Sequence, residues 1–255
     1  MNSVYFSNPD QSHQHSLRTL NALYEYDDFM MSIRTLIDMG CGSGQDLEWW
    51  ATRTTRDEDS RPLNIKCTGT DLASELTLAH RYRNMQYQPW DFETSPTVFN
   101  KKKFDIVWCH DAFQYVINPF TTLSNWYDLM APGGMMVLIL PQNTNVEFNV
   151  QLFDQHDYVY HNWTMVSLIH ILALSGFDCK GGFFLKEPND PWLHAVVYKS
   201  QIKPLDPRTT RWYDLADKDL LPVTAVDSIQ RHGYLRQQDL VLPWLDRSLR
   251  TLVNQ

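Results

Sequence analysis

The chain has 255 residues, enough for one domain with a sizeable core and an appendage. Its composition, 43% hydrophobic and 20% charged, is that of an ordinary globular protein. The net charge of −8 argues against nucleic acid as a partner, because phosphate binding needs clustered Lys and Arg. The one basic run, Lys101 to Lys103, is interpreted as a solvated edge before a strand.

Targeting and metal-binding patterns are missing from the sequence. It shows no signal-peptide pattern and no run of 18 apolar residues, so we expect a cytoplasmic protein with no membrane partner. Its four cysteines have no Cys-x-x-Cys spacing, which predicts reduced thiols and supports neither a zinc site nor a disulfide framework. The nine histidines form no metal-binding spacing; we expect no metal, and we expect His13 and His15 to be surface polar residues.

Hydrophobic periodicity gives the predicted elements in chain order. The helices are predicted at residues 12–33 with a break near Asp27, 45–51, 74–82, 121–130 and 163–175. The strands are predicted at residues 36–39, 64–70, 86–88, 104–109, 135–140, 177–186 and 192–199, with a turn at 131–134. Alternating helices and apolar strands are typical of a doubly wound, Rossmann-like α/β sheet that is mostly parallel and covered by helices on both faces. The last two strands are joined by a link too short for a helix, so we expect them to be antiparallel.

The domain prediction follows from the same pattern. Residues 1–199 form one domain, with an N-terminal helical cap at 1–35 and an irregular insert at 142–162. Residues 200–255 are too few for a core of their own, so we expect an extension that packs on the domain or on a second subunit. The second arrangement would make the protein a homodimer.

The run Leu36-Ile37-Asp38-Met39-Gly40-Cys41-Gly42-Ser43-Gly44 carries the strongest functional signal. A buried strand ends in a glycine turn and continues into a helix, as in folds that hold a nucleotide at the carboxyl end of a sheet. A dinucleotide fingerprint would need its third glycine at position 45, which is Gln45.

The run instead resembles the signature of class I S-adenosylmethionine-dependent methyltransferases, in which an acid precedes Gly-x-Gly-x-Gly. Asp38, Gly40, Gly42 and Gly44 match it, and the resemblance covers about residues 36–199. It implies a seven-stranded sheet, S-adenosyl-L-methionine as cofactor and S-adenosyl-L-homocysteine as product. We expect the backbone from Gly40 through Cys41 to Gly44 to contact the cofactor, and Asp38 to reach its amino group.

Two later segments are predicted to complete the cofactor site. Asp71 follows the second strand and can accept hydrogen bonds from both ribose hydroxyls, with Leu72 beside it; a helix N-cap is the structural alternative for Asp71. The resemblance places the adenine contacts at Trp90, Asp91 and Phe92, with Asp91 accepting from the adenine amino group; Trp90 could equally be a core residue.

The segment after the fourth strand is predicted to face the methyl group. The resemblance places the methionine part of the cofactor against His110 and Phe113. His110, Asp111 and Tyr115 are the catalytic candidates, with His110 as a general base for an oxygen or nitrogen nucleophile. The alternative is that His110 only forms the cofactor wall, because positioning alone can drive methyl transfer.

The acceptor is expected to be a small molecule or a sugar or polysaccharide precursor, because nucleic-acid-modifying motifs are missing. Tyr158, Tyr160, His161 and Trp163 are candidates for an acceptor pocket, and His194 is interpreted as a sheet histidine. Three other functions stay open: another S-adenosylmethionine-using enzyme on the same fold, a non-catalytic binding module and a nicotinamide oxidoreductase.

Overall fold

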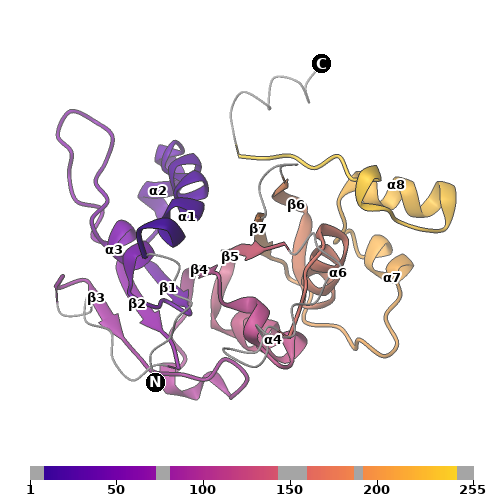
Figure 1. Cartoon of the computed structure of the whole chain (residues 1–255), viewed down its shortest axis with the longest axis horizontal. Coiled ribbons are helices and arrows are strands. Elements are labelled where there is room, and N and C mark those ends of the chain that lie inside the picture. The colour runs from indigo at the N-terminus through magenta and orange to yellow at the C-terminus, as the bar shows by residue number, and fades with distance from the viewer. Residues whose placement is uncertain (1–8, 73–80, 143–159, 187–191, 246–255) are drawn as a thin grey trace.

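The computed structural model describes residues 9–72, 81–142, 160–186 and 192–245, without the side chains of residues 9–12 (Figure 1). Seven strands form one sheet in the order β3-β2-β1-β4-β5-β7-β6. The strands are β1 (Thr35–Met39), β2 (Lys66–Thr70), β3 (Met85–Tyr87), β4 (Phe104–His110), β5 (Met130–Pro141), β6 (Phe177–Lys186) and β7 (Trp192–Lys199). The first five are parallel, and β7 is antiparallel to both of its neighbours. The predicted fold class is confirmed.

Helices cover both faces of this sheet (Figure 1). The described α-helices are α1 (Pro9–Tyr24), α2 (Asp27–Ser32), α3 (Gln45–Ala51), α4 (Pro119–Leu129), α6 (Met165–Leu174), α7 (Trp212–Asp217) and α8 (Val223–His232). Short 3₁₀ turns lie at Pro96–Phe99, Phe113–Tyr115 and Gln237–Asp239. The predicted break near Asp27 separates α1 from α2. The predicted helix at 74–82 lies mostly outside the described residues, as does the insert at 142–162.

The alternation of side chains along the strands produces two cores. In β1, Ile37 and Met39 pack in the core that includes α4, α6, α7 and α8, whereas Leu36 packs on the opposite face with α1, α2 and α3. In β4, Val107 and Trp108 divide between the two faces in the same way. Strands buried on both sides explain the near-continuous apolar runs in the sequence.

The start of β5 differs from the prediction of a turn at residues 131–134. The strand runs through this segment, but its register against β4 shifts between Phe104 and Ile106. Gly133 has a φ of +70°, a value that favours glycine. The Pro-Gly-Gly signal therefore marks an irregularity within a strand rather than a separate turn.

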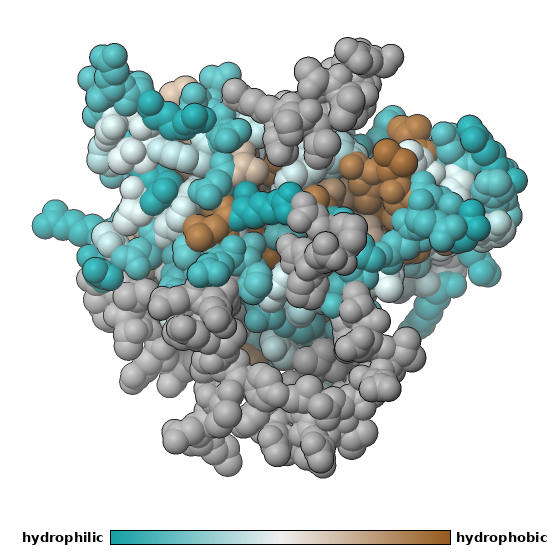
Figure 2. All heavy atoms as spheres, turned by 45° about the horizontal axis from the view of Figure 1, so that its top comes forward, coloured by the Kyte–Doolittle hydropathy of each residue, from teal (hydrophilic) through white to brown (hydrophobic). Residues whose placement is uncertain are grey.

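The extension packs against the sheet domain of its own chain. Leu215, Leu220 and Leu221 are buried in the core that contains α6. The carbonyl of Leu220 accepts a hydrogen bond from the backbone of Cys179 in β6, at 3.0 Å between nitrogen and oxygen. Some apolar side chains remain exposed on the surface beside the C-terminal helices (Figure 2).

The last described residues of the extension pack in the second core, on the other face of the sheet. Trp244 and Leu245 are buried among residues of α1, α2 and α3. The Tyr26 hydroxyl, just before α2, donates a hydrogen bond to the Leu245 carbonyl. The extension thus contacts both faces of the domain. No described helix is long and apolar enough to cross a membrane.

Candidate functional site

The glycine loop joins β1 to α3 at the carboxyl edge of the sheet. Gly40, Gly42 and Gly44 all have positive φ, at +78°, +48° and +84°. The N–H groups of Gly40 and Cys41 donate to the Thr70 carbonyl at 2.8 and 3.1 Å, which ties the loop to the end of β2. A Cβ on Gly40 would lie 2.2 Å from the Cβ of Ala112, so only glycine fits there.

Two of the acidic residues that were predicted to bind the cofactor lie at this loop. Asp71 follows β2, and one of its carboxylate oxygens accepts a hydrogen bond from the N–H of Gly42 at 3.0 Å. Asp38 is buried near the end of β1, and burial, followed by the charges of Asp46 and Asp71, raises its pKa well above the ordinary value. Leu72, beside Asp71, is exposed.

The segment after β3 lies partly in the core. Trp90 is buried and packs edge-on against Phe92 and Phe99. Phe92 also comes within 4.0 Å of where a Gly40 Cβ would lie, so it adjoins the glycine loop. Asp91 is exposed, and its carboxylate accepts from the N–H of Glu93 at 3.0 Å.

The segment after β4 brings three of the candidates to the same edge. His110 ends the strand with a buried ring, and Asp111 has a φ of +55°. Burial raises the pKa of Asp111, although the nearby charge of His110 and a 2.6 Å hydrogen bond from Gln114 oppose that shift. Tyr115 is 40% exposed.

Phe113 lies deeper than the prediction of a cofactor contact implied. Its ring is fully buried and stacks on Trp163, with 5.1 Å between centroids. The backbone of Tyr160 and His161 donates to the Gln114 carbonyl at 3.0 and 3.2 Å. The described end of the insert therefore lies beside the segment after β4, while Tyr158 lies outside the described residues.

Asp46, in the first turn of α3, is a buried acid that sequence reasoning did not select. Its Oδ1 atom lies 2.6 Å from both His13 Nδ1 and the Ser16 hydroxyl. Its Oδ2 atom lies 3.0 Å from both His110 Nδ1 and the Trp108 indole nitrogen. Burial favours a raised pKa, but the hydrogen bonds from His110 and His13 outweigh it and hold the pKa of Asp46 below its ordinary value.

The surroundings of Asp46 correct the expectation that His13 and His15 are surface residues. Both are half-buried, because α1 packs over the carboxyl edge of the sheet. The His15 ring stacks on Trp192 at 4.5 Å between centroids, and Trp192 lies 5.4 Å from the His110 ring. His194 is a buried sheet residue whose Nδ1 lies 2.8 Å from the Thr19 hydroxyl.

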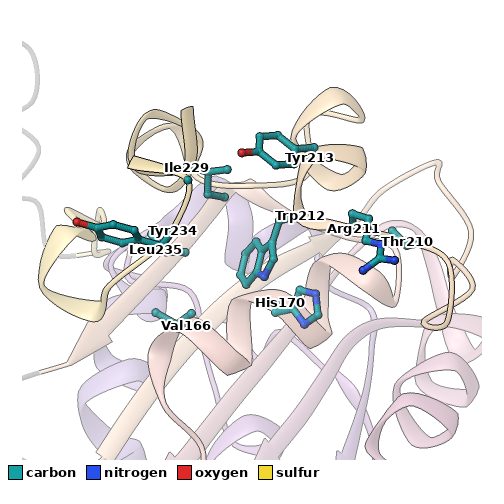
Figure 3. Close-up of a pocket in the computed structure, with 10 residues that line it drawn as sticks. Val166, His170, Thr210, Arg211, Trp212, Tyr213, Ile229, Tyr234 and Leu235 are labelled. Carbon is teal, nitrogen blue, oxygen red and sulfur yellow. The ribbon is translucent and has the colours of Figure 1, made fainter. Parts of the chain in front are cut away.

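A separate cavity of about 590 Å³ lies between α6, α7 and α8 (Figure 3). His170 and Trp212 stack there at 4.5 Å between centroids, with Tyr213 and Tyr234 nearby. Burial lowers the pKa of His170. None of its lining residues belongs to the glycine loop or to the segment after β4, so this cavity is distinct from the candidate site.

Comparison with known proteins identifies the fold around this site. Residues 37–136 match a family model described as a methyltransferase domain. No curated protein matches the sequence.

Solved structures resemble the chain at low sequence identity. One is the complex of the Haloferax volcanii Trm112 methyltransferase activator with a methyltransferase, at 17% identity and a TM-score of 0.57, covering 76% of this chain and 93% of that one. Another is the trans-methyltransferase CalH with S-adenosylhomocysteine, at 16% identity and a TM-score of 0.58, covering 76% and 60%. A third is the N-methyltransferase NodS of Bradyrhizobium japonicum WM9 with S-adenosylhomocysteine, at 14% identity and a TM-score of 0.52, covering 77% and 90%. At these identities the likeness shows a shared fold.

Proposed function

We propose that this chain, of which residues 37–136 match a methyltransferase domain, is a class I S-adenosylmethionine-dependent methyltransferase that methylates an oxygen or nitrogen atom of a small acceptor. The acceptor is a small molecule or a sugar precursor. The glycine loop, joined to Asp71 at the carboxyl edge of the sheet, is the observation that carries the proposal.

The residues present fit the cofactor. Apart from its chain neighbours, no atom of the described residues lies within 4 Å of a Cβ built on Gly42, so the loop borders space that a ligand can occupy. Asp38 and Asp71 bring two acidic side chains to this edge. S-adenosylmethionine carries an ammonium and a sulfonium, and both cations suit such an environment. The cofactor, when bound, supplies an activated methyl group.

Roles for the individual residues follow from their positions. We assign Asp71 to the ribose hydroxyls, Asp38 to the amino group and Asp91 to the adenine amino group. Phe92 adjoins the loop and supplies an apolar contact for the ring. His110, Asp111 and Tyr115 lie on the acceptor side, where His110 takes the proton of the nucleophile.

The choice of a small acceptor rests on two supports. The net charge of −8 disfavours a nucleic-acid acceptor. NodS and a Burkholderia thailandensis 1,6-didemethyltoxoflavin-N1-methyltransferase share the fold, and the second was crystallised with 1,6-didemethyltoxoflavin as well as S-adenosylhomocysteine.

Calorimetric titration tests the cofactor assignment directly. We expect micromolar binding of S-adenosylhomocysteine to the purified protein and no binding of NAD. Binding of NAD alone, or of neither compound, would contradict the proposal. The mass of the product formed from methyl-deuterated S-adenosylmethionine with candidate acceptors then separates methyl transfer from transfer of another part of the cofactor.

A further inference from the structure

We propose that Asp46 is a positioning residue that holds His110 with its proton on Nδ1, so that Nε2 is the atom that receives the acceptor's proton. The inference rests on the proposed methyltransferase function and deepens it. It implies that the acceptor is a compound whose nucleophilic oxygen or nitrogen carries a hydrogen.

Four hydrogen-bonding groups surround the carboxylate of Asp46, two at each oxygen, and two of them, the Ser16 hydroxyl and the Trp108 indole, donate whatever the histidine tautomers. His13 and Ser16 of α1 approach Oδ1 at 2.6 Å, and Trp108 and His110 of β4 approach Oδ2 at 3.0 Å. An ionised carboxylate has about four lone-pair positions and accepts only. The observed set fills them, so the carboxylate is fixed from two elements at once.

This arrangement decides the tautomer of His110. Ser16 and Trp108 donate to Asp46 and favour its ionised form, and an ionised carboxylate needs a proton on the His110 Nδ1 that faces it. The neutral ring then carries its lone pair on Nε2. That atom is buried and has no hydrogen-bond partner among the described residues.

A buried polar atom without a partner calls for an explanation, because nearly all such atoms in folded proteins are paired. His110 ends β4 at the same edge of the sheet as the glycine loop, and its side chain is 8% exposed. Trp192, with His15 stacked on it, packs against the ring from β7. The acceptor's hydroxyl or N–H group supplies the missing partner at Nε2.

The step balances in atoms and electrons. The acceptor's proton moves to Nε2, and the lone pair of its oxygen or nitrogen forms the bond to the methyl carbon. The carbon–sulfur bond breaks, and its electron pair stays on sulfur in the product thioether. The resulting imidazolium carries protons on both nitrogens, and the Asp46 carboxylate stabilises its charge.

Nuclear magnetic resonance of protein labelled with ¹⁵N-histidine tests the tautomer without any acceptor. Spectra are recorded over a series of pH values so that the neutral form of each ring is observed, and His110 is assigned from the signals lost in His110→Gln. We expect the wild-type His110 to show a protonated Nδ1 and an unprotonated Nε2. A proton on Nε2 in the wild type would overturn the inference.

Two variants extend the test. In Asp46→Leu, we expect the preference for a proton on His110 Nδ1 to be lost, because no acceptor then faces that atom. Ser16→Ala is the matched control: it removes a donor from the other oxygen of the same carboxylate and should leave the His110 signals in place. An unchanged tautomer in Asp46→Leu would also count against the inference. If that variant does not fold, the wild-type spectrum still decides.

Calorimetry with S-adenosylhomocysteine separates this inference from the proposed function. We expect wild type and Ser16→Ala to bind it with affinities within about threefold of each other, because Ser16 contacts Asp46 and none of the residues assigned to the cofactor. No binding by the wild type would refute the proposed function whatever the tautomer. Binding together with an Nε2-protonated His110 would refute only the role of Asp46.

Discussion

The backbone N–H of Gly42 donates a hydrogen bond to the carboxylate of Asp71 at 3.0 Å, across 29 positions of sequence. This bond joins the glycine loop after β1 to the first residue after β2. The two parts of the predicted cofactor site are therefore one structural unit, and a change in either part should affect the other.

Asp71→Ala should weaken S-adenosylhomocysteine binding by about 1.5–3 kcal/mol, the scale of hydrogen bonds to a charged group. The variant loses both the proposed ribose contact and the carboxylate that fixes the Gly42 N–H. Titration calorimetry measures the difference. Asp128→Ala, an exposed acid on α4, is the matched control and should leave the affinity unchanged. Equal affinities for wild type and Asp71→Ala would remove Asp71 from the site.

Gly42→Ala and Gly133→Ala form a matched pair, because both glycines have positive φ and a Cβ on either would have no described residue beyond its chain neighbours within 4 Å. Each substitution should cost about 1 kcal/mol of stability from backbone strain alone. Only Gly42→Ala should lower S-adenosylhomocysteine affinity, by about tenfold or more, because its methyl group enters the space proposed for the ligand. Urea unfolding and calorimetry give the two quantities. A similar loss of affinity in Gly133→Ala would point to a global effect instead.

Asp38→Asn should stabilise the ligand-free protein at neutral pH and weaken cofactor binding. Burial and the charges of Asp46 and Asp71 raise the pKa of Asp38, so the folded state binds this proton more tightly than the unfolded state does. Ionisation of Asp38 therefore costs stability above the raised pKa, and the cost fades as the pH falls toward the ordinary value of 3.8. The gain in melting temperature should shrink over the same range. A lower melting temperature at neutral pH would contradict this account.

Leu220→Ala should destabilise the protein by about 3 kcal/mol, the usual cost of truncating a fully buried leucine. Leu220 is 2% exposed between α7 and α8, in the core shared with the sheet. Val223→Ala is the control in the same extension; Val223 is 60% exposed, so we expect a change within about 0.5 kcal/mol. Equal stabilities for the two variants, measured by urea unfolding, would show that the extension adds little to the fold.

Most of the fold could be predicted because its signals are local. The apolar runs of β1, β4 and β5 give the parallel sheet, and the short link between β6 and β7 forces an antiparallel pair. The start of β5 was harder: Pro132 and Gly133 indicate a turn, whereas pairing with β4 keeps this segment in the strand. Pairing with β4, which is distant in the sequence, outweighed the turn preference of these two residues.

The candidate site was predictable only where residues form a motif. The glycine loop and Asp71 have characteristic spacing after strands, but Asp46 resembles any acid in the first turn of a helix, where acids are common on exposed surfaces. Its burial depends on His13 and Ser16, which are 33 and 30 positions away. The sequence did offer one hint of this cluster, a histidine and a serine on one face of α1. Nothing in the sequence indicated that their partner would be Asp46.

The burial of Trp244 and Leu245 beside α1 and α2 has a consequence for synthesis on the ribosome. The N-terminal helices emerge first, yet the core that they cover stays incomplete until residue 245 has left the exit tunnel. Until then, the strands in the first half of the chain would have apolar side chains exposed, and these could bind chaperones or associate with other chains. Full protection of this core should therefore appear only after residue 245 has left the exit tunnel.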